Sequence, residues 1–377
     1  ARVRITAQLI NAADGFHLWS ETFDRELDDI FAVQDEIASS VVKALKVKLL
    51  GEEPARLTPG GTTNAEALQA YLQGVHYRNR GSDEAALQSA AAAFQKAIEL
   101  DPEYAQAYAG LAATWDQLAT NNFVGLDQVT SKVGAAAAKA IELAPDLADG
   151  YQVLGAMLLR YKLDQDGARK AVSKALELNP GNVDVQTEYS LICAFFGERE
   201  ASIAAARTAL ELDPVSMFAN NFLGYILSFA RQYDEAIRVF RHALELDPHY
   251  PRPHYGIGMC LYLQGDAESA LNEVEQEPLL WMKFSGMAIV LRRLGRDEEA
   301  KSSMSSLIED FRDNGLYQQA QVYAQWGDID QSIQTLNRAY EIGDPGVSQL
   351  VVDPLVGPIR EDRRFVELVK KIGFVPA

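Results

Sequence analysis

Hydrophobic positions recur along most of the chain at the spacing of α-helices with one buried face. In the segment that ends at Pro248, the residues Ala236, Phe240 and Ala243 fall on one face of a helix. Gly224, in the middle of the preceding helix, has no side chain and lets the second helix approach closely. Proline cannot continue a helix, so each segment of this kind is predicted to be a helical hairpin.

The same helix ending occurs five times. Its closing prolines are separated by 43, 35, 34 and 34 residues, and the longest interval carries an insertion near residues 121–129. A generic helical bundle would not hold such a period. The endings are Ala97–Pro102, Ala140–Pro145, Ala175–Pro180, Ala209–Pro214 and Ala243–Pro248.

The period and these positions resemble those of the tetratricopeptide-repeat (TPR) family, whose repeat is about 34 residues long. The resemblance implies an all-α fold, a right-handed TPR superhelix in which stacked hairpins bury a continuous core. We expect about eight units over residues 64–345. The last three are irregular, since Pro278 shortens the sixth, and residues 346–377 form a C-terminal cap that ends in a helix over residues 362–371.

Residues 1–25 follow a different pattern. Apolar and polar residues alternate from Val3 to Leu9, which predicts a strand with one buried face. A turn at residues 12–15, a returning strand over His17–Phe23 and a helix from residue 28 to about Leu49 follow. The Pro-, Gly- and Thr-rich residues 51–63 are predicted to be a linker.

The amino-terminal sequence, with Ala7–Ile10, Leu18–Glu21, Phe23–Arg25 and Gln34–Ile37, resembles the end of the TolB-amino-terminal-like domain. In bacterial regulators that domain often precedes TPRs. The resemblance implies that residues 1–50 are part of such a domain and that this chain comes from a longer protein. Its output domain would be an adenylyl cyclase, a winged helix or a kinase.

Charge and composition narrow the class of partner. The chain of 377 residues has 53 acidic and 35 basic side chains, a net charge of −18, and 48% hydrophobic residues. Such a surface repels phosphate backbones and anionic lipids, so we expect this segment to bind neither nucleic acid nor membrane. No apolar run is long enough to span a bilayer. The sequence leaves the compartment open: the cytoplasm is favoured, and the periplasm would require an upstream transmembrane helix.

No arrangement of residues indicates catalysis. Of the five histidines, His249 and His254 are separated by two prolines and do not share a helical face. Cys193 and Cys260 lack metal-ligand spacing and are expected to be buried free thiols. No phosphate-binding loop or nucleophile elbow occurs. We therefore predict no catalytic, cofactor-binding or metal site and no enzymatic activity, although TPR arrays can be fused to transferases.

The first helix of each TPR unit lines the concave surface of the family's superhelix. Mapping its groove-facing positions onto the fourth to sixth units gives an aromatic stripe with one asparagine and one arginine. The alternative for these residues is packing between first helices. The candidates for the groove are Phe195, Phe218, Asn221, Tyr225, Phe229, Arg252, Tyr255, Met259 and Tyr262.

These residues predict a protein-binding scaffold that holds a protein or an extended peptide in its groove, since aromatic rings bury area at low entropic cost. The Lys, Asn and Arg clamp of chaperone-binding TPRs is largely absent. A small-ligand-sensing domain that controls the output domain is the alternative. We also expect a homodimer through the amino-terminal hairpin, unless the hairpin packs within its own chain.

Overall fold

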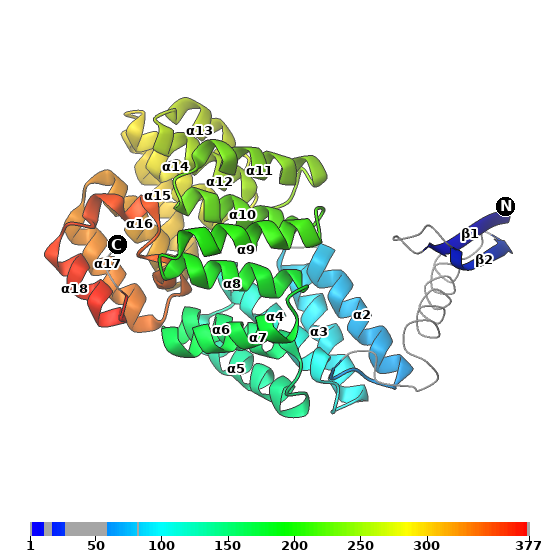
Figure 1. Ribbon diagram of the computed structural model, residues 1–377. Coiled ribbons are helices and arrows are strands. Elements are labelled where there is room, and N and C mark those ends of the chain that lie inside the picture. Colours follow the sequence, from blue (N-terminus) through cyan, green and yellow to red (C-terminus); the bar gives the residue numbers. More distant parts are fainter. Residues whose placement is uncertain (1, 11–16, 27–58, 81–82, 375–377) are drawn as a thin grey trace. The chain divides into compact units, whose positions relative to one another are not determined.

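The computed structural model describes residues 2–10, 17–26, 59–80 and 83–374. The chain separates into two compact units, residues 1–58 and residues 59–377 (Figure 1). Each unit is described by itself below. Because the division falls at residue 58, Pro59–Thr63 lie with the helical unit, where the Gly60 carbonyl accepts the Gln106 N–H at 3.2 Å.

The described part of the first unit is an antiparallel hairpin of β1 (Arg2–Ile10) and β2 (His17–Glu26). Ile5 pairs with Phe23 and Thr6 with Thr22, whose hydroxyls lie 3.0 Å apart. The two predicted strands are thus confirmed. Phe23 is only 2% exposed, so this side chain is covered within the chain itself. The predicted turn at residues 12–15 and the helix near residues 28–49 lie outside the described residues.

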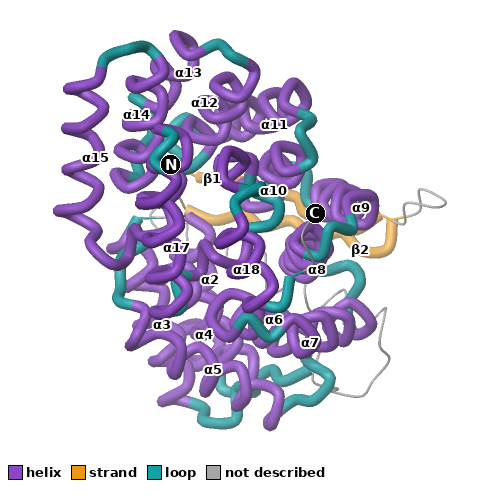
Figure 2. The backbone as a smooth tube through the Cα atoms, turned by 90° about the vertical axis from the view of Figure 1, so that its left-hand side faces the viewer, coloured by secondary structure: helices purple, strands orange, loops and turns teal. Residues whose placement is uncertain are grey.

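The second unit is built from helix pairs. Within the described residues, α2 to α17 form eight consecutive pairs, each packed on the next (Figures 1 and 2). The first helices are α2 (Ala65–Arg80), α4 (Ala105–Thr120), α6 (Ala148–Lys162), α8 (Val183–Phe195), α10 (Met217–Phe229), α12 (Pro253–Gln264), α14 (Leu280–Arg293) and α16 (Leu316–Trp326).

The second helices carry the phrases that repeat in the sequence. They are α3 (Glu84–Leu100), α5 (Leu126–Leu143), α7 (Gln165–Leu178), α9 (Arg199–Leu212), α11 (Tyr233–Leu246), α13 (Ala267–Val274), α15 (Asp297–Phe311) and α17 (Ile329–Ile342). The residue before each of the five closing prolines is extended, with φ between −147° and −142°. A proline disfavours the helical conformation of the residue before it, so each of these helices stops at the same point.

A large side chain between two glycines locks neighbouring pairs together. Phe240 is fully buried, and a Cβ added to Gly224 of its own pair or to Gly256 of the next would meet its ring at 2.5 Å. Phe94 lies in the same way between Gly74 and Gly110. The close approach predicted at Gly224 is therefore present, and it occurs both between the fifth and sixth pairs and between the first and second.

The C-terminal cap folds back onto the third pair. It consists of η2 (Pro345–Gln349), η3 (Pro354–Ile359) and α18 (Arg363–Ile372), and η1 (Arg312–Gly315) precedes α16. The Ile372 carbonyl accepts a hydrogen bond from the Gln165 amide at 3.5 Å, and one apolar cluster includes Leu159 of α6 and Phe374. Both views place α18 beside the third pair (Figures 1 and 2).

The predicted fold class, an all-α TPR solenoid with a short amino-terminal hairpin, is confirmed. Both cysteines are buried and unpaired, as predicted, and burial raises the pKa of each thiol to about 11. None of the described helices has the length and apolar character needed to cross a bilayer.

Candidate ligand cavity

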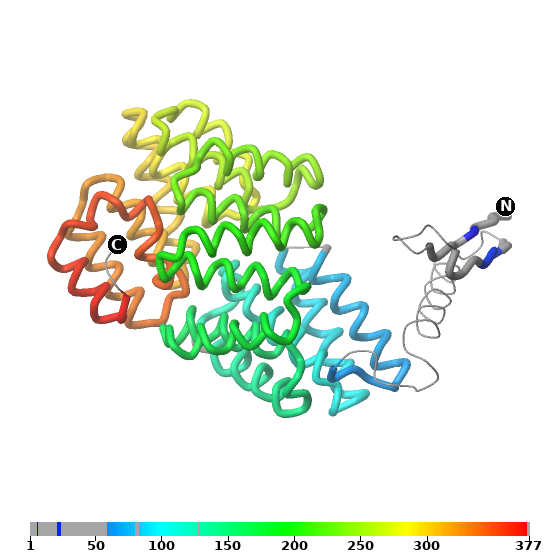
Figure 3. The backbone as a smooth tube through the Cα atoms, viewed as in Figure 1, coloured from blue at the N-terminus to red at the C-terminus, as the bar shows by residue number. Residues whose placement is uncertain are grey.

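The first helices surround a cavity of about 670 Å³. Side chains of α2, α4, α6, α8, α10, α12, α14 and α16 line it, and η2 and η3 contribute from the C-terminal cap. The predicted concave groove is therefore a partly open cavity between the first helices and the C-terminal cap. In the tube view the C-terminal segments, in orange and red, lie at the left beside the ends of the green helices (Figure 3).

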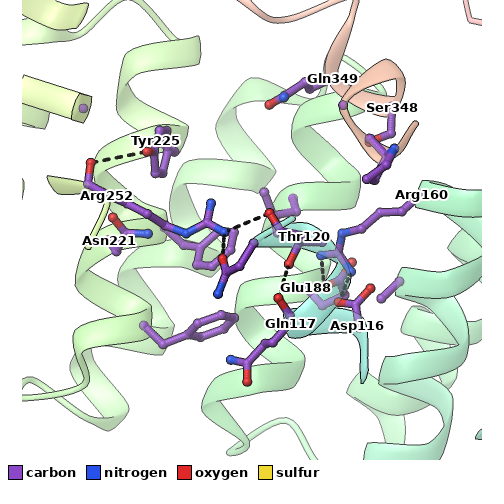
Figure 4. Close-up of a pocket in the computed structure, with 18 of the residues that line it drawn as sticks. Asp116, Gln117, Thr120, Arg160, Glu188, Asn221, Tyr225, Arg252, Ser348 and Gln349 are labelled. Atoms are coloured by element: carbon purple, nitrogen blue, oxygen red, sulfur yellow. Dashed lines mark hydrogen bonds and ion pairs between the residues drawn. The ribbon is translucent and has the colours of Figure 1, made fainter. Parts of the chain in front are cut away.

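Two hydrogen bonds and one ion pair join helix pairs that are far apart in the sequence. The Arg252 guanidinium donates to the Thr120 carbonyl at 3.3 Å and to the side-chain oxygen of Asn121 (Figure 4). Arg78 of the first pair forms an ion pair with Asp184 of the fourth at 3.1 Å. These contacts connect helix pairs that lie three and four places apart along the array, and all five residues line the cavity.

The backbone at Arg252 is held in an unusual conformation. Arg252 lies between two prolines and has φ of 89°, which costs a non-glycine residue about 1–3 kcal/mol. The buried carboxylate of Glu277 accepts the N–H groups of Arg252, Tyr255 and Leu279 at 3.0–3.1 Å. Burial raises the pKa of Glu277, and these N–H groups oppose that rise. Glu277 thus fixes the residue that reaches across the cavity.

Most predicted groove residues lie together at one end of the cavity. Eight of the nine line it: Phe195, Phe218, Asn221, Tyr225, Phe229, Arg252, Tyr255 and Met259. The rings of Phe195 and Tyr225 lie 6.3 and 6.4 Å from that of Phe229. We call the five aromatic residues Phe195, Phe218, Tyr225, Phe229 and Tyr255 the aromatic end.

These residues differ in how exposed they are to the cavity. Phe195, Tyr255 and Met259 are at most 7% exposed, so they pack within the core as well as lining the cavity. Phe218 and Phe229 are half-buried. Tyr262 does not line the cavity. Its hydroxyl donates instead to the Gln325 side chain of α16, at 2.9 Å. Whether the lining residues bind a partner stays a prediction.

The opposite end of the cavity is charged. The Arg160 guanidinium bridges two carboxylates, Asp116 at 3.0 Å and Glu188 at 2.8 Å, and the Tyr161 hydroxyl donates to Asp116 at 2.9 Å (Figure 4). Glu188 is 2% exposed. Burial raises the pKa of Glu188, and Arg160 opposes that rise.

This charged region was not among the predicted groove residues, although the positions within the repeat indicate it. Mid-helix small residues occupy equivalent places in the first helices. The residue five positions later lines the cavity in the first, second, third and fifth pairs, and so does the residue four positions later in the first, second and fifth. This rule gives Phe229 from Gly224, but also Arg78 and Asn79 from Gly74, Asp116 and Gln117 from Ala112, and Arg160 from Gly155. We call Arg78, Asn79, Asp116, Gln117, Arg160 and Glu188 the polar end.

Unpartnered polar atoms gather around the cavity. Among the described residues, seven buried side-chain atoms have no hydrogen-bond partner, and five of them belong to residues that line it. They are Gln117 Oε1, Glu188 Oε1, Asn221 Oδ1, Trp281 Nε1 and Gln321 Oε1. Buried polar groups are normally paired, so this concentration indicates a ligand site. No group of three or more His, Cys, Asp and Glu within the described ranges is arranged to hold a metal ion.

Two segments match family models described as tetratricopeptide repeat, residues 230–279 and 314–342. They cover the end of the fifth pair with the sixth, and most of the eighth. The chain therefore contains tetratricopeptide repeats, and arrays of this class generally act as non-enzymatic scaffolds for protein interactions.

A curated relative is named "Putative adenylate cyclase 3" and comes from Rhizobium meliloti (strain 1021). It is 37% identical over 144 residues, which are 36% of this chain and 23% of the relative. The chain thus matches about a quarter of that protein's length.

Solved structures of human IFIT1 share the fold. The dimer with m7Gppp-AAAA is 15% identical, with a TM-score of 0.56 over 90% of this chain and 78% of that one. A monomeric IFIT1 mutant with the same compound also has a TM-score of 0.56 and is 15% identical, over 83% of this chain and 80% of its own. At this level of identity the likeness concerns the fold alone.

Proposed function

We propose that this chain is an interaction and regulatory module that binds a short extended segment of a protein partner in the cavity. The observation that carries the proposal is the cavity itself, with half-buried aromatic rings and unpartnered buried polar atoms on one lining. Aromatic rings supply contact area, and the unpartnered groups can pair with a peptide backbone.

We also propose that the module belongs to a larger bacterial signalling protein. The match to a protein named as an adenylate cyclase supports this, as does the resemblance of residues 1–50 to a TolB-amino-terminal-like domain. Occupation of the cavity would then regulate an output domain elsewhere in the parent.

The compound bound by IFIT1 is not expected here. The cavity lining includes the carboxylates of Asp116, Asp184, Glu188, Asp213, Asp344 and Asp353. Together with the net charge of −18, they repel a chain of phosphates. The shared fold therefore does not imply the same ligand.

A peptide library displayed on phage and selected on the purified chain tests the proposal. We expect short sequences to be retained, and we expect Phe218→Ala to weaken their binding about tenfold or more, because Phe218 is a half-buried ring on the cavity wall. Phe196→Ala is the matched control, since its half-buried ring lies outside the lining beneath Arg169. Failure to retain any peptide, or equal losses in both variants, would contradict the proposal.

A small organic ligand is the second candidate, favoured by the size of the cavity. The volume of about 670 Å³ falls within the range of roughly 300–1,000 Å³ typical of small-molecule sites. Native mass spectrometry of the purified chain would reveal such a ligand as a constant added mass. Phe218→Ala should lower the fraction of protein molecules that carry it.

Self-association through the hairpin stays a separate proposal. Each strand has one neighbour in the described sheet, which leaves an edge open for a second copy. The burial of Phe23 favours packing within one chain instead. Sedimentation at micromolar concentration decides between them, since a monomer would exclude the dimer.

A further inference from the structure

The unpartnered atoms at the cavity share a chemical character. Four of them accept hydrogen bonds, namely Gln117 Oε1, Glu188 Oε1, Asn221 Oδ1 and Gln321 Oε1, and Trp281 Nε1 is the only donor among them. A ligand that satisfies them must therefore bring mainly N–H or O–H donors. An anionic ligand, which accepts hydrogen bonds, leaves the four acceptors unpaired.

Charge points the same way. Six carboxylates line the cavity, and the guanidinium groups on the lining are those of Arg78, Arg160 and Arg252. Arg78 already pairs with Asp184, and Arg160 is shared by Asp116 and Glu188. One guanidinium between two carboxylates leaves a negative charge uncompensated at the polar end.

The uncompensated charge can be assigned to one carboxylate oxygen of Glu188. Its Oε2 atom lies 2.8 Å from Arg160, whereas its Oε1 atom has no partner, and the residue is 2% exposed. Gln117, the neighbour of Asp116 on α4, adds a second unpartnered acceptor at the same end. A buried carboxylate oxygen forms its strongest hydrogen bond with a charged donor.

The other end of the cavity offers complementary groups. The indole N–H of Trp281 has no partner, and the Arg252 guanidinium lies 5.8 Å from the centre of the same indole ring. No carboxylate of the described residues lies within ion-pair distance of this guanidinium; its hydrogen bonds go to neutral oxygens. A carbonyl group of the ligand can accept from Trp281, while its apolar part lies against the aromatic end.

We infer that the ligand of this cavity carries a cationic nitrogen, an alkylammonium or guanidinium group, which donates to Glu188 Oε1 and Gln117 Oε1 while its apolar part contacts the aromatic end. The inference rests on the proposed function, because it names the ligand of the same cavity. Two sources supply this chemistry, the basic side chain of a peptide and a free diamine.

The test uses three probes with the whole chain in isothermal titration calorimetry. They are acetyl-Phe-Lys-Phe-amide, its analogue with neutral norleucine in place of lysine, and 1,5-diaminopentane. We expect the lysine peptide to bind about tenfold tighter than the norleucine peptide, since only its ammonium pairs with a buried carboxylate. Its affinity should also fall as salt is added.

Variants locate the charge. Glu188→Gln keeps an acceptor toward Arg160 but removes the charge, and it should reduce the preference for lysine to about twofold or less. Glu198→Gln is the control, because its ion pair with Arg169 at 2.8 Å is exposed and lies outside the lining. Should Glu188→Gln not fold, Gln117→Met removes the second acceptor, and it should lower the preference for lysine about threefold.

The outcomes separate this inference from the proposed function. Equal affinity for the lysine and norleucine peptides overturns the inference and leaves peptide binding intact. Binding of 1,5-diaminopentane alone, lost in Glu188→Gln, supports the cationic ligand and contradicts a peptide partner. If none of the three probes binds at millimolar concentration, or if Glu198→Gln abolishes the preference as Glu188→Gln does, the inference is wrong.

Discussion

The two ends of the cavity are built on the same scaffold and carry opposite chemistry. At the aromatic end, the residue five positions after Gly224 is Phe229; at the polar end, the residues at the equivalent places after Gly74 and Gly155 are Asn79 and Arg160. All of them project from first helices toward the cavity. Repeat geometry therefore determines where these side chains lie, and the residue chosen at each place determines what the cavity can bind.

The ends also differ in how they are stabilised. Rings pack against one another and against the core at the aromatic end, where most contacts are apolar and the Tyr225 hydroxyl donates to the Arg252 carbonyl at 3.4 Å. The polar end depends on one guanidinium held between two carboxylates. A change at the polar end should consequently have the larger effect on stability, because it leaves charge without compensation.

The largest expected effect is that of Arg160→Met. Removing the guanidinium leaves Asp116 and Glu188 facing each other in a buried site, and we expect the free energy of unfolding to fall by about 3–5 kcal/mol. Arg169→Met is the matched control, since its ion pair with Glu198 is 46% and 39% exposed and should contribute about 1 kcal/mol or less. Urea unfolding followed by circular dichroism measures both. Losses of similar size would show that the polar end is not held by Arg160.

The second prediction tests whether both ends share one packing scaffold. An added methyl at Gly110 would meet Phe94 at 2.6 Å, and one at Gly256 would meet Phe240 at 2.5 Å. We therefore expect Gly110→Ala and Gly256→Ala each to destabilise the chain by about 1–3 kcal/mol in urea unfolding.

Gly134→Ala serves as the control for these two variants. Its added Cβ would meet only the end of Met157, at 3.4 Å, an ordinary contact within helix α5. Alanine is the better helix former by about 1 kcal/mol, so this variant should be neutral or slightly stabilising. A large loss at Gly256 together with none at Gly110 would show that only the aromatic end depends on this close approach.

The scaffold was predictable from the sequence because it depends on local spacing. Ala236, Phe240 and Ala243 recur at helical intervals, and all three are fully buried. The same spacing placed the predicted aromatic residues on the inner surface. Tyr262 shows the limit of that rule, since its hydroxyl turns to Gln325 of α16, a partner that the repeat pattern does not mark.

Closure of the cavity could not be predicted in this way. The Arg252 guanidinium reaches a carbonyl at Thr120, 132 residues earlier, and the positive φ of Arg252 depends on a carboxylate from Glu277. The 34-residue pattern does not record such contacts, because Arg252 and Thr120 belong to helix pairs four places apart and Glu277 lies after the sixth pair. Most of the polar end was missed for a simpler reason. Its residues apart from Glu188 lie in the first three units, whereas the groove positions were mapped only onto the fourth to sixth.

The last prediction concerns a third buried acid, where the cap meets the cavity. Asp344 lines the cavity like Glu188, yet both of its oxygens accept backbone N–H groups, from Gly346 at 2.8 Å and Tyr317 at 3.0 Å. Burial nevertheless outweighs these bonds and raises the pKa of Asp344 from 3.8 to about 6. The folded state therefore binds a proton that the unfolded state releases at a lower pH.

The sign of the effect follows from this rise. The stability that Asp344 contributes is fully present below pH 3.8 and is lost as the pH rises through about 6. Asp344→Asn cannot titrate, so the free energy of unfolding of the native chain relative to this variant should fall between pH 4 and pH 6 and then level off. Urea unfolding at several pH values measures the difference.

Asp362→Asn is the control of opposite sign, because hydrogen bonds from Arg364 lower the pKa of Asp362 to about 2. The stability that Asp362 contributes should therefore grow with pH below pH 4. A difference for Asp344→Asn that stays constant from pH 4 to pH 6 would mean that its backbone N–H partners, and not burial, determine its ionisation, and the cap would then close the cavity without a proton.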